Sequence, residues 1–461
     1  MRKGFLAAVL AALIGGVLLN PASAAVKAGT ACTKAGLTSV SAGIKYTCIK
    51  SGKKLVWDKG VKISSTGSAP APAPKPSASS NVANVQIPEV SPETEFAPAS
   101  DCKIVKGGNN PDIFTGFPRD QKYIPSSGNR KSIVFFVDFP DLPADPRAIT
   151  VWKQTLIPYA QKAFMAMSYG KYQLAYEMNE KFFHLSIPYA SYIKNEAGNL
   201  PGSVPAQALD TNKLLNDALR IADPEIDFSQ YDFVNVVTPT FKPKTEGGAS
   251  GGGGFNVDGK TSFLATLGPI DEYLDDATKK NWLLHETGHL LGLNHIYAGA
   301  KGPAGWDVMG NVFGNDDLLG WNKFVLGWIG DNQVHCIVTP LEKESIHLLT
   351  PVGTESNSTK LAIIKLSQTK AIVVEVRRKT DIDNLSQADS GVIVYTLDTT
   401  VPDNQGAINI VSNPMKYGFD TRRNRVLLGS MDVGESVTTQ GFTVRVIASV
   451  AAGDYVSISK A

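Results

Sequence analysis

Three of the six histidines in this 461-residue chain lie close together, at His285, His289 and His295. Residues four apart share one face of an α-helix, so a helix through His285 and His289 points both imidazoles at one position. His295 follows six residues later, and at about 100° per residue a continuous helix would turn it roughly 240° away from that face. The helix must therefore end first. Gly292 is where it can, because glycine accepts the left-handed conformation of a helix C-terminus.

Glu286 stands beside the first histidine of this group. The segment from His285 to His295 fits H-E-x-x-H-x-x-G-x-x-H, the zinc signature typical of metzincin metallopeptidases. Three protein ligands leave the fourth zinc position open to water, which is the catalytic rather than the closed structural arrangement. We therefore predict that His285, His289 and His295 bind one catalytic Zn²⁺ and that Glu286 is the general base. A bare H-E-x-x-H arises by chance in ordinary helices, but the added glycine and third histidine make chance a poor explanation.

A methionine in a glycine-bracketed turn follows, in the segment Gly305–Gly310. Methionine packs readily beneath imidazoles because its thioether is flexible and polarisable. The sequence therefore predicts that Met309 forms a Met-turn under the zinc. Some metzincins carry a tyrosine two residues after this methionine, where it can assist the transition state. Asn311 occupies that position here, and Tyr297 is a candidate replacement, although a core or surface tyrosine is the simpler interpretation of it.

The chain also resembles the M6 (immune inhibitor A-like) family of secreted bacterial metzincin zinc metallopeptidases. Beyond the zinc motif, the resemblance rests on segments in the family's order: Ser132–Asp141, Ser168–Lys171, Asp227–Asp232, Trp321–Trp328, Val374–Arg378 and Ser390–Tyr395. It covers residues 101 to 400. The resemblance implies a metzincin-like domain that cleaves protein or peptide substrates. It also implies structural Ca²⁺, for which the candidate ligands are Asp138, Asp141, Asp316 and Asp317.

The N-terminus is typical of an export signal. Arg2 and Lys3 precede an apolar run, Phe5–Leu19, and the small residues Ala22–Ala25 follow it. A membrane span needs about 20 apolar residues, and no second long apolar stretch occurs. We predict a signal peptide at residues 1–24 and a mature protein without a transmembrane segment, secreted or held at the cell surface. A lipid on Cys32 is the alternative, although the residues before it match a lipidation site poorly.

Four cysteines suit an exported protein with two disulfides, and they allow three connectivities. Proximity favours Cys32–Cys48, which closes a small module, and then Cys102–Cys336, which staples the ends of the predicted peptidase domain. The alternative is that Cys102 binds the zinc as a latency switch, because thiolate is a good zinc ligand.

Composition divides the chain. Residues 25–62 hold eight lysines and one acid, and we predict a small disulfide-closed module there. Its lysines favour contact with an anionic cell-surface polymer; the alternative is that they form a solvated face without a partner.

Residues 63–100 are rich in Pro, Ala and Ser and predict an extended linker, with a cleavable propeptide as the alternative. No glycine pattern resembles a phosphate-binding loop, and we expect no nucleic-acid partner.

The remainder predicts an α+β fold: a metzincin-like peptidase domain at 101–335 and an all-β, sandwich-like domain at 336–461. Expected strands are 133–139, 231–237, 361–366, 371–377, 392–397 and 442–447, and expected helices are 151–167, 214–222 (capped by Asp210 or Thr211) and a zinc helix starting near Asp275. The glycine-rich segment 247–254 is interpreted as a loop over the cleft or as a plain surface loop. His184, His335 and His347 have no partner at ligand spacing and are interpreted as structural.

These observations favour a secreted zinc-dependent endopeptidase. Two other functions remain open at this point: a zinc-containing adhesion or surface-binding protein without peptidase activity, and a zinc hydrolase of a cell-wall polymer. The intact Glu286 argues against the first, because a protein that only needs zinc would tolerate its loss.

Overall fold

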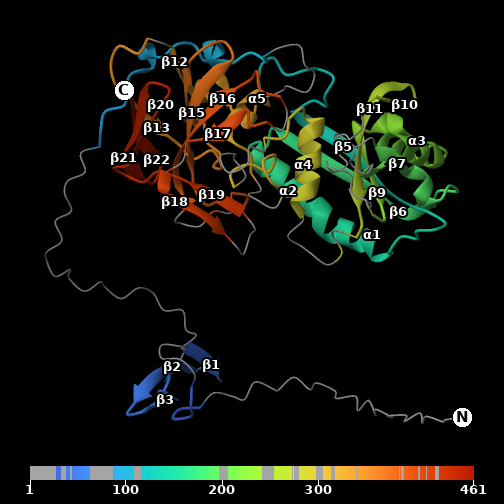
Figure 1. The fold of residues 1–461 in the computed structure, drawn as a ribbon, viewed down its shortest axis with the longest axis horizontal. Coiled ribbons are helices and arrows are strands. Elements are labelled where there is room, and N and C mark those ends of the chain that lie inside the picture. The colour runs from blue at the N-terminus through green and yellow to red at the C-terminus, as the bar shows by residue number, and fades with distance from the viewer. Residues whose placement is uncertain are drawn as a thin grey trace, which may run out of the picture. The chain divides into compact units, whose positions relative to one another are not determined.

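The computed structural model shows two separate units, Met1–Val82 and Ala83–Ala461 (Figure 1). The residues that the structure describes are 27–32, 38–41, 44–62, 87–107, 116–196, 206–240, 254–271, 274, 280–296, 305–312, 317–338, 340–383, 385, 389–402, 405–411, 413–420 and 425–461. The predicted signal peptide, most of the predicted linker and the glycine-rich segment up to residue 253 lie outside them. Within the described residues, no helix is long and apolar enough to cross a membrane.

The small unit is an antiparallel sheet built around one strand. β2 (Ile44–Ser51) pairs with β1 (Thr38–Ser41), β3 (Lys54–Trp57) and β4 (Val61–Lys62). Its core, as far as the side chains are described, consists of three buried residues, Tyr46, Cys48 and Trp57. So small a core stabilises a fold weakly, and the Cys32–Cys48 disulfide supplements it.

The larger unit begins with a mostly parallel sheet in the order β10-β11-β9-β5-β6. Its strands are β5 (Gly128–Asp138), β6 (Tyr172–His184), β9 (Phe233–Thr238), β10 (Phe255–Val257) and β11 (Lys260–Pro269). β10 is antiparallel to its neighbour, and the others run parallel. β5 is buried without interruption from Ser132 to Asp138, as expected for a strand covered on both faces. The strands predicted at 133–139 and 231–237 are confirmed.

Helices cover both faces of this sheet. α1 (Arg147–Val151), a π-helical turn (Trp152–Leu156) and α2 (Ile157–Met167) form one continuous run, and α3 is Thr211–Ala222. Figure 1 shows α2 and α4 (Trp282–Leu290) together on one side of the sheet and α3 on the other. Of the two predicted caps, it is Asp210 that caps α3, by accepting from the Lys213 amide. The start predicted for α4, near Asp275, lies outside the described residues; the helix as described begins at Trp282.

The rest of the larger unit is rich in β-strands, as expected. One sheet contains β12 (Val334–Val338), β14 (Leu361–Lys365), β15 (Lys370–Arg377), β16 (Gly391–Asp398) and β17 (Ile408–Ile410), and another contains β13 (Ser345–Leu349), β20 (Ser436–Thr439), β21 (Phe442–Val450) and β22 (Gly453–Lys460). The larger unit also contains two antiparallel strand pairs, β7–β8 (Ile193–Glu196, Ala206–Leu209) and β18–β19 (Asn413–Asp420, Arg425–Gly429), and the helix α5 (Gly320–Val325). The division predicted between residues 335 and 336 falls inside β12.

The sheet containing β15 is shared between two cores. Leu361, Val373 and Tyr395 pack into the core of the peptidase-like region, whereas Ala362 and Val374 pack against the second β-sheet. This alternation follows from the period of two along a strand. One sheet therefore joins the two regions that the sequence separates.

Residues 87–107, which include two short 3-10 helices (Glu93–Glu95 and Ala99–Cys102), are here called the N-terminal strap. The strap crosses the β-rich region: the amides of Ser91, Ala97 and Val105 donate to the carbonyls of Ile346, Cys336 and Gln368, each at 2.9 Å. The buried Cys102–Cys336 disulfide fixes it to β12. The start of the predicted peptidase domain thus lies on the strands that follow that domain.

Candidate metal centre

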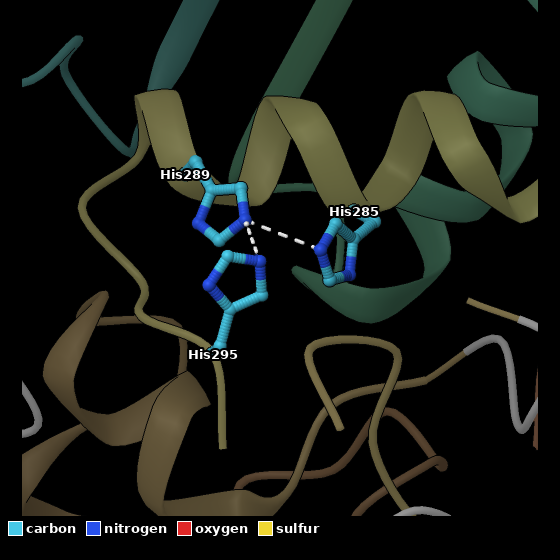
Figure 2. Close-up of side chains that lie close together, drawn as sticks. All are labelled: His285, His289 and His295. Carbon is cyan, nitrogen blue, oxygen red and sulfur yellow. Dashed lines mark hydrogen bonds between the residues drawn. The ribbon is translucent and has the colours of Figure 1, made fainter. Parts of the chain in front are cut away.

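The three histidines of the sequence motif converge on one point (Figure 2). His289 Nε2 lies 3.2 Å from His285 Nε2 and 3.1 Å from His295 Nε2. Zn–N bonds of about 2.0–2.1 Å in tetrahedral geometry place two ligand nitrogens about 3.3 Å apart. The three imidazoles therefore fit a zinc ion. Within the described residues, they are the one group of His, Cys, Asp or Glu close enough together to hold a metal ion.

Gly292 ends the zinc helix and turns the chain back toward it. Its φ is +88°, and the next amide, of Leu293, donates to the Gly288 carbonyl at 2.9 Å. This is the left-handed helix ending that glycine favours. A Cβ at Gly292 would also lie 2.6 Å from the ring of Tyr123. Both the backbone conformation and the packing thus require glycine where the sequence predicted the helix to stop.

Backbone carbonyls fix the orientation of two of the imidazoles. His285 Nδ1 lies 2.8 Å from the Val308 carbonyl, and His289 Nδ1 lies 2.8 Å from the Leu293 carbonyl. Since a carbonyl can only accept, each Nδ1 carries the hydrogen and each Nε2 keeps its lone pair for a metal. Burial lowers the pKa of His285 to about 4, with a smaller contribution from His295. The His285 ring is therefore neutral at pH 7.

Met309 packs directly against the zinc helix. A Cβ added to Gly288 would lie 2.5 Å from Met309 Sδ, which places the thioether against the turn between His285 and His289. The Met309 carbonyl also accepts from the Ile296 amide at 3.3 Å, next to the third histidine. The turn thus contacts the chain close to both ends of the histidine motif.

Glu286 is a buried carboxylate beside the histidines. It is 3% exposed, and its Oε2 has no hydrogen-bond partner among the described residues. Burial raises the pKa of Glu286 to about 8. A buried polar atom of this kind calls for a ligand or a water, so the side chain fits a site that receives one.

The predicted calcium ligands do not form a site in the described part of the chain. Asp138 Oδ1 lies 2.5 Å from His184 Nδ1, and Asp141 Oδ1 accepts from the Tyr189 amide at 2.6 Å. Asp317 is fully buried and lies 2.7 Å from Lys323 Nζ. The other candidate, Asp316, and the proposed tyrosine, Tyr297, lie outside the described residues.

The cysteines and the remaining histidines have partners. Cys102 is bonded to Cys336 and Cys32 to Cys48, the pairing that proximity favoured, so neither Cys102 nor Cys32 has a free thiol for zinc or lipid. His335 and His347 are not isolated, because their Nδ1 atoms lie 2.9 Å apart.

Sequence reasoning missed a buried ionic network beneath the Met-turn. Glu375 and Arg377 are both fully buried on β15. The signal was present, because Glu375 and Arg377 interrupt the apolar run that begins at Ala371 in this strand. Asp307 lies in the turn segment Gly305–Gly310, where a polar residue is ordinary, so its burial could not be predicted from the sequence.

Comparison with known proteins agrees with this geometry. A family model described as metallo-peptidase family M12B, reprolysin-like, matches residues 176–296, which include α4 and all three histidines. The chain carries a metallopeptidase domain. The match supports a zinc-dependent peptide hydrolase, but it covers a minor part of the chain and does not point to the M6 family. No curated protein matches the chain significantly.

Proposed function

We propose that this protein is a secreted zinc endopeptidase, related to the M6 peptidases, with a zinc ion held by His285, His289 and His295. The observation that carries the proposal is the convergence of three Nε2 atoms, at 3.1 and 3.2 Å, beside a buried and unsatisfied carboxylate. Three ligands leave one coordination position open, as in catalytic sites.

Zinc at such a centre supplies Lewis-acid activation of water near neutral pH. Glu286 would then act as the general base. Its carboxylate takes the proton from the water whose oxygen bonds to the peptide carbonyl carbon. When the C–N bond breaks, Glu286 delivers that proton to the leaving amine nitrogen. The burial of Glu286 favours this role, because its Oε2 has no hydrogen-bond partner among the described residues and can accept from a water in the site.

Export is part of the proposal. Two disulfides suit an oxidising compartment, and the basic and apolar N-terminus suits a cleaved signal peptide. N-terminal sequencing of protein recovered from the culture medium tests this part. A mature N-terminus near Ala25 is expected, and retention of residues 1–24 would contradict it.

Casein hydrolysis by the mature protein, with and without a zinc chelator, tests the activity. Glu286→Gln keeps the shape of the side chain but removes the base, so we expect it to bind one zinc per chain and to lose at least a hundredfold in kcat, within the range of general acid–base catalysis, about 10²–10⁴-fold. Glu180→Gln is the matched control, because Glu180 is an exposed glutamate of β6 paired with Lys153.

If Glu286→Gln cleaved casein at the wild-type rate, Glu286 could not be the general base. Zinc binding without cleavage of casein, combined with hydrolysis of purified cell-wall material, would replace the peptidase by a wall hydrolase. Absence of zinc from the purified protein, even after zinc is supplied, would contradict the metal centre itself.

A further inference from the structure

A buried ionic cluster on β15 lies at the junction of the two cores. The Arg377 guanidinium donates from Nε and Nη2 to the two carboxylate oxygens of Asp383, at 2.8 and 2.9 Å, and from Nη1 to Glu375 Oε1 at 3.1 Å. The side chains of Arg377 and Glu375 are 0% exposed. Burying such charges is costly unless their hydrogen bonds are satisfied, and replacing them by apolar side chains is often neutral. Their geometry therefore calls for an explanation beyond stability.

Glu375 connects β15 to the start of α5. Its Oε2 accepts from the Gly320 amide at 2.7 Å and from the Tyr395 hydroxyl at 2.8 Å. The same hydroxyl oxygen accepts from the Trp321 amide at 3.1 Å. A Cβ at Gly320 would lie 2.7 Å from Glu375 Oε2, so the first turn of α5 approaches the carboxylate closely.

Arg377 connects the same strand to the Met-turn. Its guanidinium lies 5.7 Å from the centre of the Trp306 ring, within the distance of a cation–π contact. Trp306 is 1% exposed and directly precedes Asp307. The tryptophan is thus held between a fixed cation and the core.

Asp307 joins α5 to the Met-turn. Its Oδ2 accepts from the Leu319 amide at 2.7 Å and from Asn322 Nδ2 at 2.9 Å, and its Oδ1 accepts from the Met309 amide at 2.7 Å. One carboxylate therefore fixes the shape of the turn relative to α5. Between Asp307 and Met309 lies Val308, whose carbonyl is 2.8 Å from His285 Nδ1.

We propose that Arg377 and Glu375 are positioning residues for the metal centre. Arg377 holds Trp306 in place, and Glu375 holds the start of α5. Trp306 and α5 in turn fix the position of Asp307. Asp307 then sets the shape of the turn whose Val308 carbonyl orients His285. The inference rests on the zinc site of the proposed function but not on peptidase activity. It assigns part of the metal centre's support to a strand of the β-rich region, outside residues 176–296.

The test compares variants of the full-length protein. Arg377→Met fills much of the same space but loses all donors, and we expect zinc affinity, measured by competition with a chromogenic chelator, to fall about 10- to 100-fold, as for outer partners of metal ligands. The visible spectrum of the cobalt-substituted protein should change as well, because His285 would no longer be held in place. In the presence of saturating zinc, kcat should fall while KM stays near its wild-type value.

The residue that directly follows β15 offers a matched control. Arg378 points away from this cluster, and its Nη2 lies 2.6 Å from Asp454 Oδ1. Arg378→Met removes one arginine next to the end of β15 and should leave zinc affinity and the cobalt spectrum unchanged. A purely stabilising role of Arg377 would lower the unfolding midpoint without altering either measurement.

A folded Arg377→Met variant with wild-type zinc affinity and cobalt spectrum overturns the proposal. If this variant does not fold, Tyr395→Phe replaces it, because only the hydroxyl between Glu375 and the Trp321 amide is lost. A weaker zinc affinity in Tyr395→Phe supports the proposal, and an unchanged affinity overturns it. Wild-type protein that binds zinc without cleaving any substrate contradicts the peptidase alone, since the affinity comparison does not depend on activity.

Discussion

Gly288, inside the zinc motif, is needed for packing rather than for backbone conformation. It lies within α4, two residues before the helix ends at Leu290, and a Cβ there would be 2.5 Å from Met309 Sδ. Neither the Met-turn nor the helix can move away freely, because the Val308 carbonyl is bonded to His285. Close contact between helix and thioether therefore depends on the absence of a side chain at residue 288.

We predict that Gly288→Ala destabilises the protein by about 1–3 kcal/mol through overpacking. In the middle of a helix that has room, the same change should stabilise by about 0.8–1.0 kcal/mol. The sign of the change in stability therefore shows whether Met309 fills the space beside residue 288. Urea unfolding of Gly288→Ala measures the overpacking cost together with the gain in helix propensity, and the same substitution in a Met309→Ala background measures the gain alone. Alanine should be unfavourable in the first case and neutral or favourable in the second, and an equal cost in both would refute the contact.

The sequence could predict the centre of the site but not its support. His285, His289 and Glu286 are read from helical spacing, and Gly292 from the need to end the helix, so all the necessary information is local. Arg377 reaches Trp306 only because β15 folds back beneath the Met-turn. No periodicity connects two residues so far apart in the chain.

Among the elements, the N-terminal strap depends on a buried histidine pair. Phe96 stacks on the His335 ring with 4.1 Å between centroids and lies 5.0 Å from the His347 ring. Glu93 Oε1 lies 2.9 Å from His335 Nε2, and Ser345 Oγ lies 2.9 Å from His347 Nε2. The strap therefore covers a chain of hydrogen bonds that a second proton would disturb.

We predict that this pair makes the fold sensitive to acid. Burial, aided by the charge of His335, lowers the pKa of His347 to about 3. An unfolded histidine has a pKa of about 6.5, so between these values the unfolded state binds the proton and the folded state does not. The stabilising contribution of the neutral ring is complete above about pH 6.5 and is lost as the pH falls toward 3.

Chelator-treated protein, unfolded in urea at pH 7 and pH 5, tests this sign. From pH 7 to 5, His347 alone should remove about 2 kcal/mol from the free energy of unfolding. His347→Gln lacks the titrating ring and should lose less than wild type by that amount. Equal losses in the two proteins would exclude His347 as the source of acid sensitivity.

Elements with a clear period were predictable and elements without one were not. The apolar run from Ile133 and the mostly apolar run at 371–377 both appear at their expected places in β5 and β15. The helical run that continues into α2 begins at Arg147, four residues before the predicted start at residue 151. This start was not predictable from the sequence, because Pro146 and Arg147 carry no apolar periodicity. The strap has an irregular polar sequence without a clear period. Its position is determined by hydrogen bonds to residues far along the chain, which the sequence does not reveal.

At the scale of the whole larger unit, the β-rich region shares a sheet with the core that contains the candidate metal centre. Composition and strand pattern suggested a separate module after residue 335, which could bind a partner independently. The structure instead gives the sheet of β15 one face in each core. The strap and the Cys102–Cys336 disulfide further tie its first strand to the segment that precedes β5.

We therefore predict that Ala83–Ala461 unfolds as one cooperative unit. Removing either region would expose one face of the shared sheet, including Val373 and Tyr395 on one side and Val374 on the other, so neither should persist alone. Native-state hydrogen exchange in increasing urea, resolved by mass spectrometry, measures this directly. As urea increases, the exchange of the amides of β5, α4 and β15 should come to occur through one global unfolding reaction. Their opening free energies should then have the same dependence on urea. If the amides of β14 and β15 stayed protected after those of β5 and α4 had exchanged, the regions would be independent domains, and the support of His285 by Arg377 would lose its structural basis.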